Sequence, residues 1–397
     1  MTAARARAQL AADVSRFFGP FRRNEEAKYN LGLGEIECRN ALMEEAMGQK
    51  EKIAGKLLSS LSKYPGCQGY MPLNEKIAEL IKAETGMDFN PGQIVLTAGA
   101  ADAISHAVFV YSHAGEKVMF PVPSFPYWCS VARNESLIEP IMCMPQDFSD
   151  KLSGRIEARA KNVSMLILNV PHNPYGCSIE RGEAEKINET ASRHKIKVVI
   201  DDVYRAFTKK EWIGNSFDME NSVIVDSLSK RFGVPGLRLG FAALPKVEVK
   251  HFRAAVANQY VGVSMPSAII ADALLEAYLS NKKLNTIPKE IEKRQEILDS
   301  YLKKLEPYGI FSQKPEGGMF RAVFCRDANL LAAELAGKNV IVKGGRSNFP
   351  FSYAGMPEFI RISVGGEERI REAAEIIAET VKEIEMPLEG EKIAVIR

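Results

Sequence analysis

Lys230 lies in a stretch of unusual composition, DSLSKRFGVPGLRLGF, which covers residues 226–241. Small hydroxyl residues flank this lysine, and a Pro-Gly pair and Arg238 follow it. The apolar run at residues 223–225 comes just before, so we expect Lys230 to lie beyond the end of a buried strand. A solvated surface lysine needs none of these neighbours. An amine in such a place can condense with an aldehyde to form a Schiff base, and Arg238 can bind an anion nearby.

Other polar, small or aromatic residues stand where further apolar runs end. In open α/β sheets, ligands bind beyond the carboxyl ends of the strands, so we expect these residues to gather in one place. They are Gly99, Ala100, Ala101, Phe125, Asn173, Asp201, Tyr204 and Ser227.

Their chemistry matches the needs of one cofactor, pyridoxal phosphate. Its aldehyde needs Lys230, and its pyridine nitrogen needs a carboxylate to stay protonated, which Asp201 supplies. Its phenolic oxygen needs donors such as Tyr204 and Asn173. The ring can stack on an aromatic face, for which we expect Phe125.

The phosphate of this cofactor needs donors of its own. Backbone N–H groups at the start of a helix bind phosphate well, and Gly99, Ala100 and Ala101 occupy such a position. The Arg238 guanidinium and the Ser227 hydroxyl complete the expected phosphate site.

The elements that would position these residues form a repeated pattern of strand, turn and helix. Runs that are apolar throughout suit strands buried on both faces of a mainly parallel sheet. The pattern predicts an α/β fold with a seven-stranded sheet and helices on both faces. The runs are residues 93–99, 117–123, 136–144, 164–171, 197–204, 222–229 and 239–244, and helical patterns cover 100–115 and 183–195.

The pattern changes after residue 280. Long charged amphipathic helices are predicted at residues 286–309 and 367–385, with short strands at 318–325, 339–345 and 359–365. We therefore predict an N-terminal segment (1–50) that packs with a small α/β C-terminal domain (281–397), and a large cofactor-binding domain (51–280).

Composition excludes several classes of function. The chain has 397 residues, with 52 Lys and Arg against 50 Asp and Glu, so it carries no basic field for nucleic acid. No apolar run reaches spanning length, so we expect no membrane association. The 6 cysteines lack CxxC spacing, and the 5 histidines lack ligand spacing. We predict a cytoplasmic protein with free thiols and no metal.

The chain resembles the fold-type I pyridoxal-phosphate enzymes, specifically the class I/II aminotransferases, over nearly its whole length. The stretch around Lys230 is similar to that family's cofactor-lysine signature, including the spacing of eight residues to Arg238. The segments LGLGE (31–35), Y-x4-G-x3-L (64–73), N-P-x-G (173–176) and RISVGG (361–366) match other motifs in the family's order.

The resemblance implies an aminotransferase that moves an amino group between an L-amino acid and a 2-keto acid. Lys230, Asp201 and Tyr204 would be its catalytic residues. Gly34, Asn173 and Arg361 would bind the substrate, with the Arg361 guanidinium on its α-carboxylate. Tyr64 would reach the phosphate of the neighbouring subunit's cofactor, which implies a homodimer with shared active sites.

Several residues depart from the family pattern. Tyr175 stands where threonine is usual, and Asn74 stands where arginine commonly follows the leucine. Asp102 would place a negative charge near the phosphate unless it faces the pyridine side. The sequence KGGRSNF replaces P-G-x-x-F and brings Arg346 toward the expected substrate side chain, although a solvated loop arginine is the better interpretation. These departures leave the amino donor open, with Arg346, Arg22 and Arg23 as candidates for binding a second carboxylate.

Alternatives remain at three points. Asp202 could replace Asp201, and Tyr127 or Trp128 could replace Phe125. The same cofactor could also serve elimination, replacement or cyclisation of an amino acid with a side-chain leaving group. A cofactor-sensing DNA-binding regulator does not fit, because the segment before the core is too short for a DNA-binding module. A dinucleotide loop at residues 32–34 lacks the third glycine.

Overall fold

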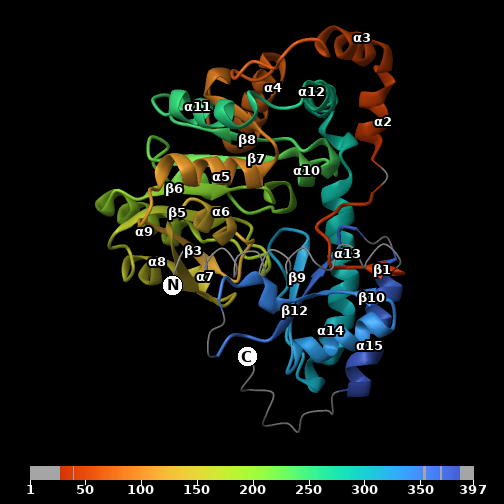
Figure 1. The fold of residues 1–397 in the computed structure, drawn as a ribbon. Coiled ribbons are helices and arrows are strands. Elements are labelled where there is room, and N and C mark those ends of the chain that lie inside the picture. Colours follow the sequence, from red (N-terminus) through yellow and green to blue (C-terminus); the bar gives the residue numbers. More distant parts are fainter. Residues whose placement is uncertain (1–26, 39, 352–354, 367–368, 385–397) are drawn as a thin grey trace.

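A computed structural model describes residues 27–38, 40–351, 355–366 and 369–384 of the chain. Figure 1 shows a large sheet with its helices in the upper part of the view, and a smaller group of strands and helices below it. The C-terminal residues, in blue, form most of the smaller group, and the strand at residues 29–30 joins them.

The large sheet has seven strands, as predicted, in the order β2-β8-β7-β6-β5-β3-β4. The strands β7, β6, β5, β3 and β4 run parallel to one another, whereas β8 runs antiparallel to both of its neighbours. The sheet is therefore mainly parallel. Its strands are β2 (Ile94–Thr97), β3 (Lys117–Val122), β4 (Leu137–Met142), β5 (Val163–Asn169), β6 (Lys197–Asp201), β7 (Ser222–Ser227) and β8 (Gly240–Ala243).

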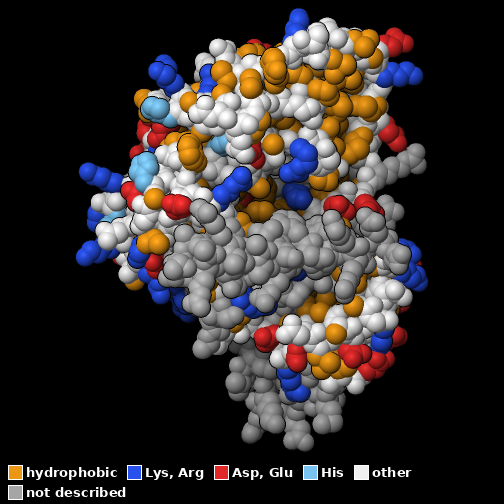
Figure 2. Space-filling model, viewed as in Figure 1, with side chains coloured by type: hydrophobic (Ala, Val, Ile, Leu, Met, Phe, Trp, Pro, Cys, Tyr) orange, Lys and Arg blue, Asp and Glu red, His pale blue; other side chains and the backbone are white. Residues whose placement is uncertain are grey.

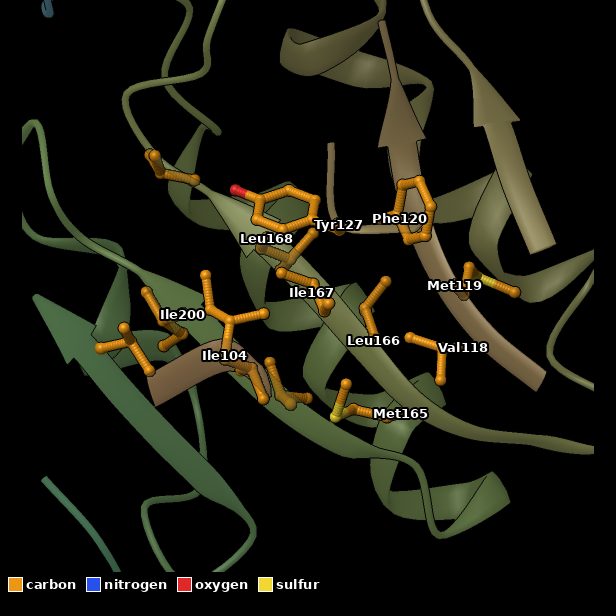
Figure 3. Packing of buried hydrophobic residues seen from close by; sticks show 14 of the residues in the cluster. Ile104, Val118, Met119, Phe120, Tyr127, Met165, Leu166, Ile167, Leu168 and Ile200 are labelled. Carbon is orange, nitrogen blue, oxygen red and sulfur yellow. The ribbon is translucent and has the colours of Figure 1, made fainter. Parts of the chain in front are cut away.

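Helices cover both faces of this sheet, because its strands are apolar on both faces. In β7, Val223 and Val225 join one hydrophobic cluster and Ile224 joins another. Figure 3 shows part of the first cluster, in which Leu166 and Ile167 pack beside Val118 and Ile104. The helices of these layers are α2 (Ala41–Gly48), α3 (Lys50–Ser60), α4 (Met71–Thr85), α5 (Ala100–Tyr111), α6 (Trp128–Arg133), α7 (Asp147–Asp150), α8 (Leu152–Glu157), α9 (Arg181–His194), α11 (Val249–Tyr260) and α12 (Met265–Ser280).

The smaller group contains a three-stranded antiparallel sheet in the order β11-β12-β9 and a parallel pair of β1 with β10. A third hydrophobic cluster joins Tyr29 and Leu31 to residues from 287 onward. The domain boundaries at residues 50 and 280 stay predictions. The elements are β1 (Tyr29–Asn30), β9 (Phe320–Phe324), β10 (Val340–Ile341), β11 (Lys343–Gly344), β12 (Phe359–Ser363), α13 (Ile287–Leu302), α14 (Ala328–Gly337) and α15 (Ile370–Ile384).

One predicted helix is shorter than expected. The pattern at residues 286–309 suggested a single helix, but α13 ends at Leu302 and a 3₁₀ helix continues from Lys303 to Tyr308. Pro307 explains the change, because proline has no N–H to donate and its ring clashes with a continuing α-helix. Within the described residues, no helix is long and apolar enough to cross a membrane.

Candidate active site

A cavity of about 360 Å³ opens at the carboxyl ends of the parallel strands, a volume suited to a small ligand. Figure 2 shows a hollow near the middle of this face, with basic side chains beside it. All but one of the predicted site residues line the cavity; the exception is Tyr64, which is 90% exposed and lies outside it. The predicted residues in the lining are Gly34, Gly99, Ala100, Ala101, Phe125, Asn173, Asp201, Tyr204, Ser227, Lys230, Arg238 and Arg361.

Lys230 enters the cavity from α10 (Leu228–Arg231), the short helix that begins where β7 ends. The Ser227 hydroxyl caps this helix by accepting a hydrogen bond from the backbone N–H of Ser229 at 3.0 Å. The Lys230 amine is half-buried and donates to the carbonyl of Gly34. Burial, with the nearby charges of Arg361 and Arg238, lowers the pKa of Lys230 to about 8. A substantial fraction of this amine is therefore neutral near pH 8.

Asp201 ends β6 and is 3% exposed. Its carboxylate accepts hydrogen bonds from the Tyr127 hydroxyl at 2.5 Å and from the backbone N–H of Val203 at 3.4 Å. Burial raises the pKa of Asp201 to about 7, although both hydrogen bonds act in the opposite direction. The next residue, Asp202, does not line this cavity; its carboxylate accepts from the Trp212 indole at 3.1 Å. The geometry thus favours Asp201 over Asp202.

Arg361, Asn173 and Tyr204 form one hydrogen-bonded group on the cavity wall. The Arg361 guanidinium donates to Asn173 Oδ1 at 3.3 Å, and Asn173 Nδ2 donates to Tyr204 Oη at 3.4 Å. The guanidinium also donates to the carbonyl of Gly32 at 2.9 Å and lies 4.1 Å above the centre of the Phe320 ring. Burial lowers the pKa of Arg361 to about 10. Burial also raises the pKa of Tyr204, so its hydroxyl remains protonated.

The opposite end of the cavity is built by the start of α5 and by Arg238. Gly99 precedes the helix with φ of +95°, and a Cβ there would lie 2.9 Å from a terminal nitrogen of Arg238. Only glycine therefore fits without displacing the guanidinium. Arg238 itself has φ of +49°, in the left-handed region that non-glycine residues rarely adopt. Asp102 does not line the cavity, and its carboxylate binds Tyr260, His106 and the backbone N–H of Ala98.

Three residues at or beside the cavity were missed by the sequence analysis. Asn169, at the end of β5, accepts from the backbone of Asn173 and donates to the carbonyl of Asp201, which fixes both strand ends. The Tyr127 hydroxyl binds Asp201, whereas the sequence suggested only a core or stacking role. The third is Lys343 in β11.

Lys343 lines the cavity and is 7% exposed. It pairs with Arg361 across the β11–β12 ladder, so both side chains lie on the same face of that sheet. Burial and the charge of Arg361 lower the pKa of Lys343 to about 5. Arg346, the residue of this loop that the sequence analysis considered, donates to the carbonyl of Phe349 and does not line the cavity.

The other departures from the family pattern have structural explanations. Asn74 is fully buried and its amide donates to three backbone carbonyls, which hold the loops around α4 together. Tyr175 lies in the core, where its hydroxyl donates to the carbonyl of Cys143 at 3.2 Å. Neither residue lines the cavity. Arg22 and Arg23 lie outside the described residues.

Comparison with known proteins agrees with this arrangement. A family model described as aminotransferase class I and II matches residues 27–377. The chain belongs to the class I and II aminotransferase family. It is 26% identical over 372 residues to an aspartate aminotransferase of Pyrococcus horikoshii, with 91% of each chain covered. It is 25% identical over 379 residues to aromatic-amino-acid aminotransferase 2 of Thermococcus litoralis, covering 90% of this chain and 92% of the relative.

The fold is that of a solved aminotransferase as well. The structure of Thermus thermophilus aspartate aminotransferase with maleate has a TM-score of 0.79, at 20% identity, with 94% of this chain and 96% of that chain covered. This likeness confirms the fold-type I architecture expected for the sheet and its helices.

Class I and II aminotransferases use pyridoxal phosphate, and the cavity fits this cofactor. A Cβ at Gly34 would lie only 3.2 Å from the Lys230 amine, so the absence of a side chain leaves room around that nitrogen. The Arg361 Nε is buried and has no hydrogen-bond partner among the described residues. Because Arg361 lines the cavity, this donor is available to an anionic ligand there.

Proposed function

We propose that this aminotransferase transfers the amino group of an L-amino acid to a 2-keto acid, with Lys230 as its central catalytic residue. The observation that carries the proposal is the half-buried Lys230 amine with a lowered pKa, which faces a cavity also lined by Asp201 and Arg361. When bound, pyridoxal phosphate supplies an aldehyde for the amine and a ring that stabilises negative charge at the substrate Cα. A neutral Lys230 amine can then accept the proton from Cα and return it.

The strand ends supply the remaining cofactor contacts in this proposal. Asp201 binds the pyridine nitrogen and keeps it protonated. Tyr204 and Asn173 donate to the phenolic oxygen. At the other end, Arg238 and Ser227, with the N–H groups of residues 99–101, bind the phosphate. Phe125 packs on the ring face.

Arg361 orients the substrate by its α-carboxylate. The guanidinium now donates to the neutral oxygens of Asn173 and Gly32, and no described residue forms an ion pair with it. A carboxylate is a stronger acceptor than these groups and matches the planar guanidinium in a paired geometry. Asn173 holds the guanidinium in the orientation that this geometry requires.

We propose that the amino donor carries an anionic side chain. Lys343 and Arg361 are neighbours across the β11–β12 ladder, and both line the cavity. Burial and the Arg361 charge keep the Lys343 amine neutral before substrate binds. A substrate with two carboxylates would pair one with the Arg361 guanidinium and favour the charged form of Lys343 beside the other. The name of the Pyrococcus horikoshii relative, an aspartate aminotransferase, supports the same substrate class.

We also propose a homodimer with shared active sites in the cytoplasm. Tyr64 and Leu61 are largely exposed, and Leu58 is 75% exposed, on or just after α3. Figure 2 shows hydrophobic side chains gathered at the upper right, where Figure 1 places α3 and α12. A second copy of the chain would cover this surface, and Tyr64 would then reach the phosphate of the cofactor bound to that second copy. Sedimentation of the cofactor-loaded protein at the mass of a single chain would contradict the dimer.

The proposed reaction can be tested by adding amino acids one at a time to the cofactor-loaded protein without a keto acid. Aspartate or glutamate should convert the bound cofactor stoichiometrically to pyridoxamine phosphate, and a 2-keto acid should reverse the change. Ammonia release with spontaneous recovery of the cofactor would instead indicate elimination.

The variant Lys343→Met tests the substrate class. It should weaken the reaction with aspartate by about tenfold or more, because a charged hydrogen bond is lost, and leave phenylalanine or alanine unaffected. An equal loss for all donors would contradict the role of Lys343.

A further inference from the structure

The turn between β3 and α6 carries a second residue that bears on the cofactor site. Phe125 in this turn lines the cavity, and Tyr127 lies two residues later at the start of α6. Tyr127 is 2% exposed, and its hydroxyl donates to Asp201 Oδ2. This contact crosses β5, because β3 and β6 are separated by that strand in the sheet.

The ring of Tyr127 is part of the core, whereas its hydroxyl is not. The ring lies 5.7 Å from the Phe120 ring and 5.6 Å from the Phe125 ring, measured between centroids. Figure 3 shows the ring beside Leu168 at one end of the cluster, with the hydroxyl oxygen pointing away from Phe120. Phenylalanine would fill the same space, so packing alone does not explain the hydroxyl.

Asp201 is a carboxyl group under opposing influences. The titratable groups that act on it from the elements packed against it are Tyr127, Tyr204 and Asp226 of β7. Burial and the charge of Asp226 favour the neutral acid, whereas the Tyr127 hydroxyl and the Val203 N–H favour the carboxylate. Burial also keeps the Tyr127 phenol protonated, so it remains a donor.

We propose that Tyr127 is a positioning residue for Asp201: its hydroxyl fixes the carboxylate and keeps it ionised, so that Asp201 can hold the proton on the pyridine nitrogen. The inference rests on the proposed function, in which Asp201 faces that nitrogen. Without the hydroxyl, the shared proton would move toward the carboxyl group. The cofactor ring would then lose positive charge and withdraw electrons less strongly from the substrate Cα.

The test compares Tyr127→Phe with Tyr175→Phe. Tyr175 is a matched control, because it is equally buried in the same cluster and its hydroxyl binds a backbone carbonyl away from the cavity. Tyr127→Phe should lower kcat by about tenfold with little change in KM, since a hydrogen bond to a charged group is lost. Tyr175→Phe should leave kcat unchanged.

Two further measurements do not depend on turnover. The pH midpoint of the bound cofactor's visible band should rise by about half a unit or more in Tyr127→Phe, because less positive charge on the ring makes protonation nearby easier. With a cofactor analogue that has carbon in place of the ring nitrogen, the wild type and Tyr127→Phe should have the same pH midpoint.

Two results would overturn the inference. One is a pH midpoint in Tyr127→Phe equal to that of Tyr175→Phe. The other is a difference in midpoint between Tyr127→Phe and the wild type that persists with the analogue. Failure of the proposed function would look different. In that case, the wild type itself would not transaminate, or Asp201→Ala would leave cofactor affinity and the visible band unchanged.

Discussion

Two pairs of adjacent residues, Asp201–Asp202 and Lys230–Arg231, divide between two sides of the large sheet. Asp201 and Lys230 face the cavity, whereas Asp202 and Arg231 face the hydrophobic cluster on the other side, between the sheet and α4. Each side thus receives one acidic and one basic residue from the same two strand ends. The two sides nevertheless treat these charges differently.

On the closed side, the charges satisfy one another. The Arg231 guanidinium binds both oxygens of Glu84 at 2.7 and 2.8 Å and Asp226 at 2.8 Å. Asp202 accepts from the Trp212 indole, and Tyr278 donates to Glu84. Burial and the charge of Asp226 raise the pKa of Asp202 well above its usual range. The charged groups of this network thus find their partners within it, although the Arg231 Nε has no hydrogen-bond partner among the described residues.

On the open side, the cations lack carboxylate partners. Among the residues that the structure describes, none forms an ion pair with Lys230, Arg238 or Arg361, and their hydrogen bonds end on neutral oxygens. Arg361 is the buried cation of the three, and a buried charge is costly unless it is paired. The two sides contain similar types of charged residue. The binding side differs in that its cations have no carboxylate partner in the protein and can bind an anionic ligand.

The largest effect should follow from Lys230→Ala on the open side. Turnover should fall by about 10⁴-fold or more, because both the amine that holds the cofactor and the base at Cα are lost. Stability should change little. Stopped-flow measurement of the reaction with aspartate checks this, with added methylamine as a control that returns part of the rate. Near-normal turnover would contradict the catalytic role of Lys230 and the proposed contrast between the two sides.

On the closed side, Arg231→Met should act on stability instead. It leaves the buried Asp226 and the half-buried Glu84 without their cation, which should lower the free energy of unfolding by about 3–5 kcal/mol. Urea titration of the cofactor-loaded protein measures this change. A triple variant that also carries Glu84→Gln and Asp226→Asn should recover much of the loss. If Arg231→Met removed the cofactor's visible band while the protein stayed folded, the closed side would belong to the site.

The smallest effect concerns the pH dependence of binding at Lys343. The pKa of this lysine is lowered to about 5, so its amine is neutral at pH 7 until an anion binds beside it. Binding of a dicarboxylate should therefore take up a proton, and its affinity should fall as pH rises above about 5, by at most about tenfold per pH unit. Calorimetric titrations with succinate and with butanoate, each at several pH values, measure the affinity and the proton uptake of the two ligands.

Butanoate lacks the second carboxylate and serves as the control for this titration. Other groups that titrate in the cavity change the affinity for both ligands in the same way. The variant Lys343→Met should give succinate the pH dependence of butanoate. Equal pH dependence of the two ligands in the wild type would show that Lys343 does not meet the second carboxylate.

Much of the fold and site could be predicted because both depend on local patterns. Each buried strand is a continuous apolar run, and the residue that follows it lies at the edge where ligands bind. This reasoning places Asp201, Asn173 and Lys230 in one cavity. The family motif adds Arg361, which belongs to a different sheet and would not be found from strand ends of the large sheet alone.

The rest depends on contacts between distant segments. Tyr127 reaches Asp201 across β5, and nothing in the sequence near either residue states this. Lys343 lies opposite Arg361 because of the register between two antiparallel strands. This register cannot be predicted when the sequence does not fix where the two strands end. Arg346 was one sequence-based candidate for binding a second carboxylate, whereas Lys343 was not considered. Asn74 and Tyr175 looked like changes at the site because their buried partners were unknown.

The cavity is built by two sheets that share no strand. The large sheet supplies the residues expected to hold the cofactor, and the β11-β12-β9 sheet supplies Lys343 and Arg361. On the proposed role of Lys343, a change in β11 would alter which amino donor the cavity accepts, while the residues from the large sheet stay in place. For protein engineering, this separation makes position 343 a point at which the choice of amino donor can be redesigned while the reaction chemistry is inherited intact.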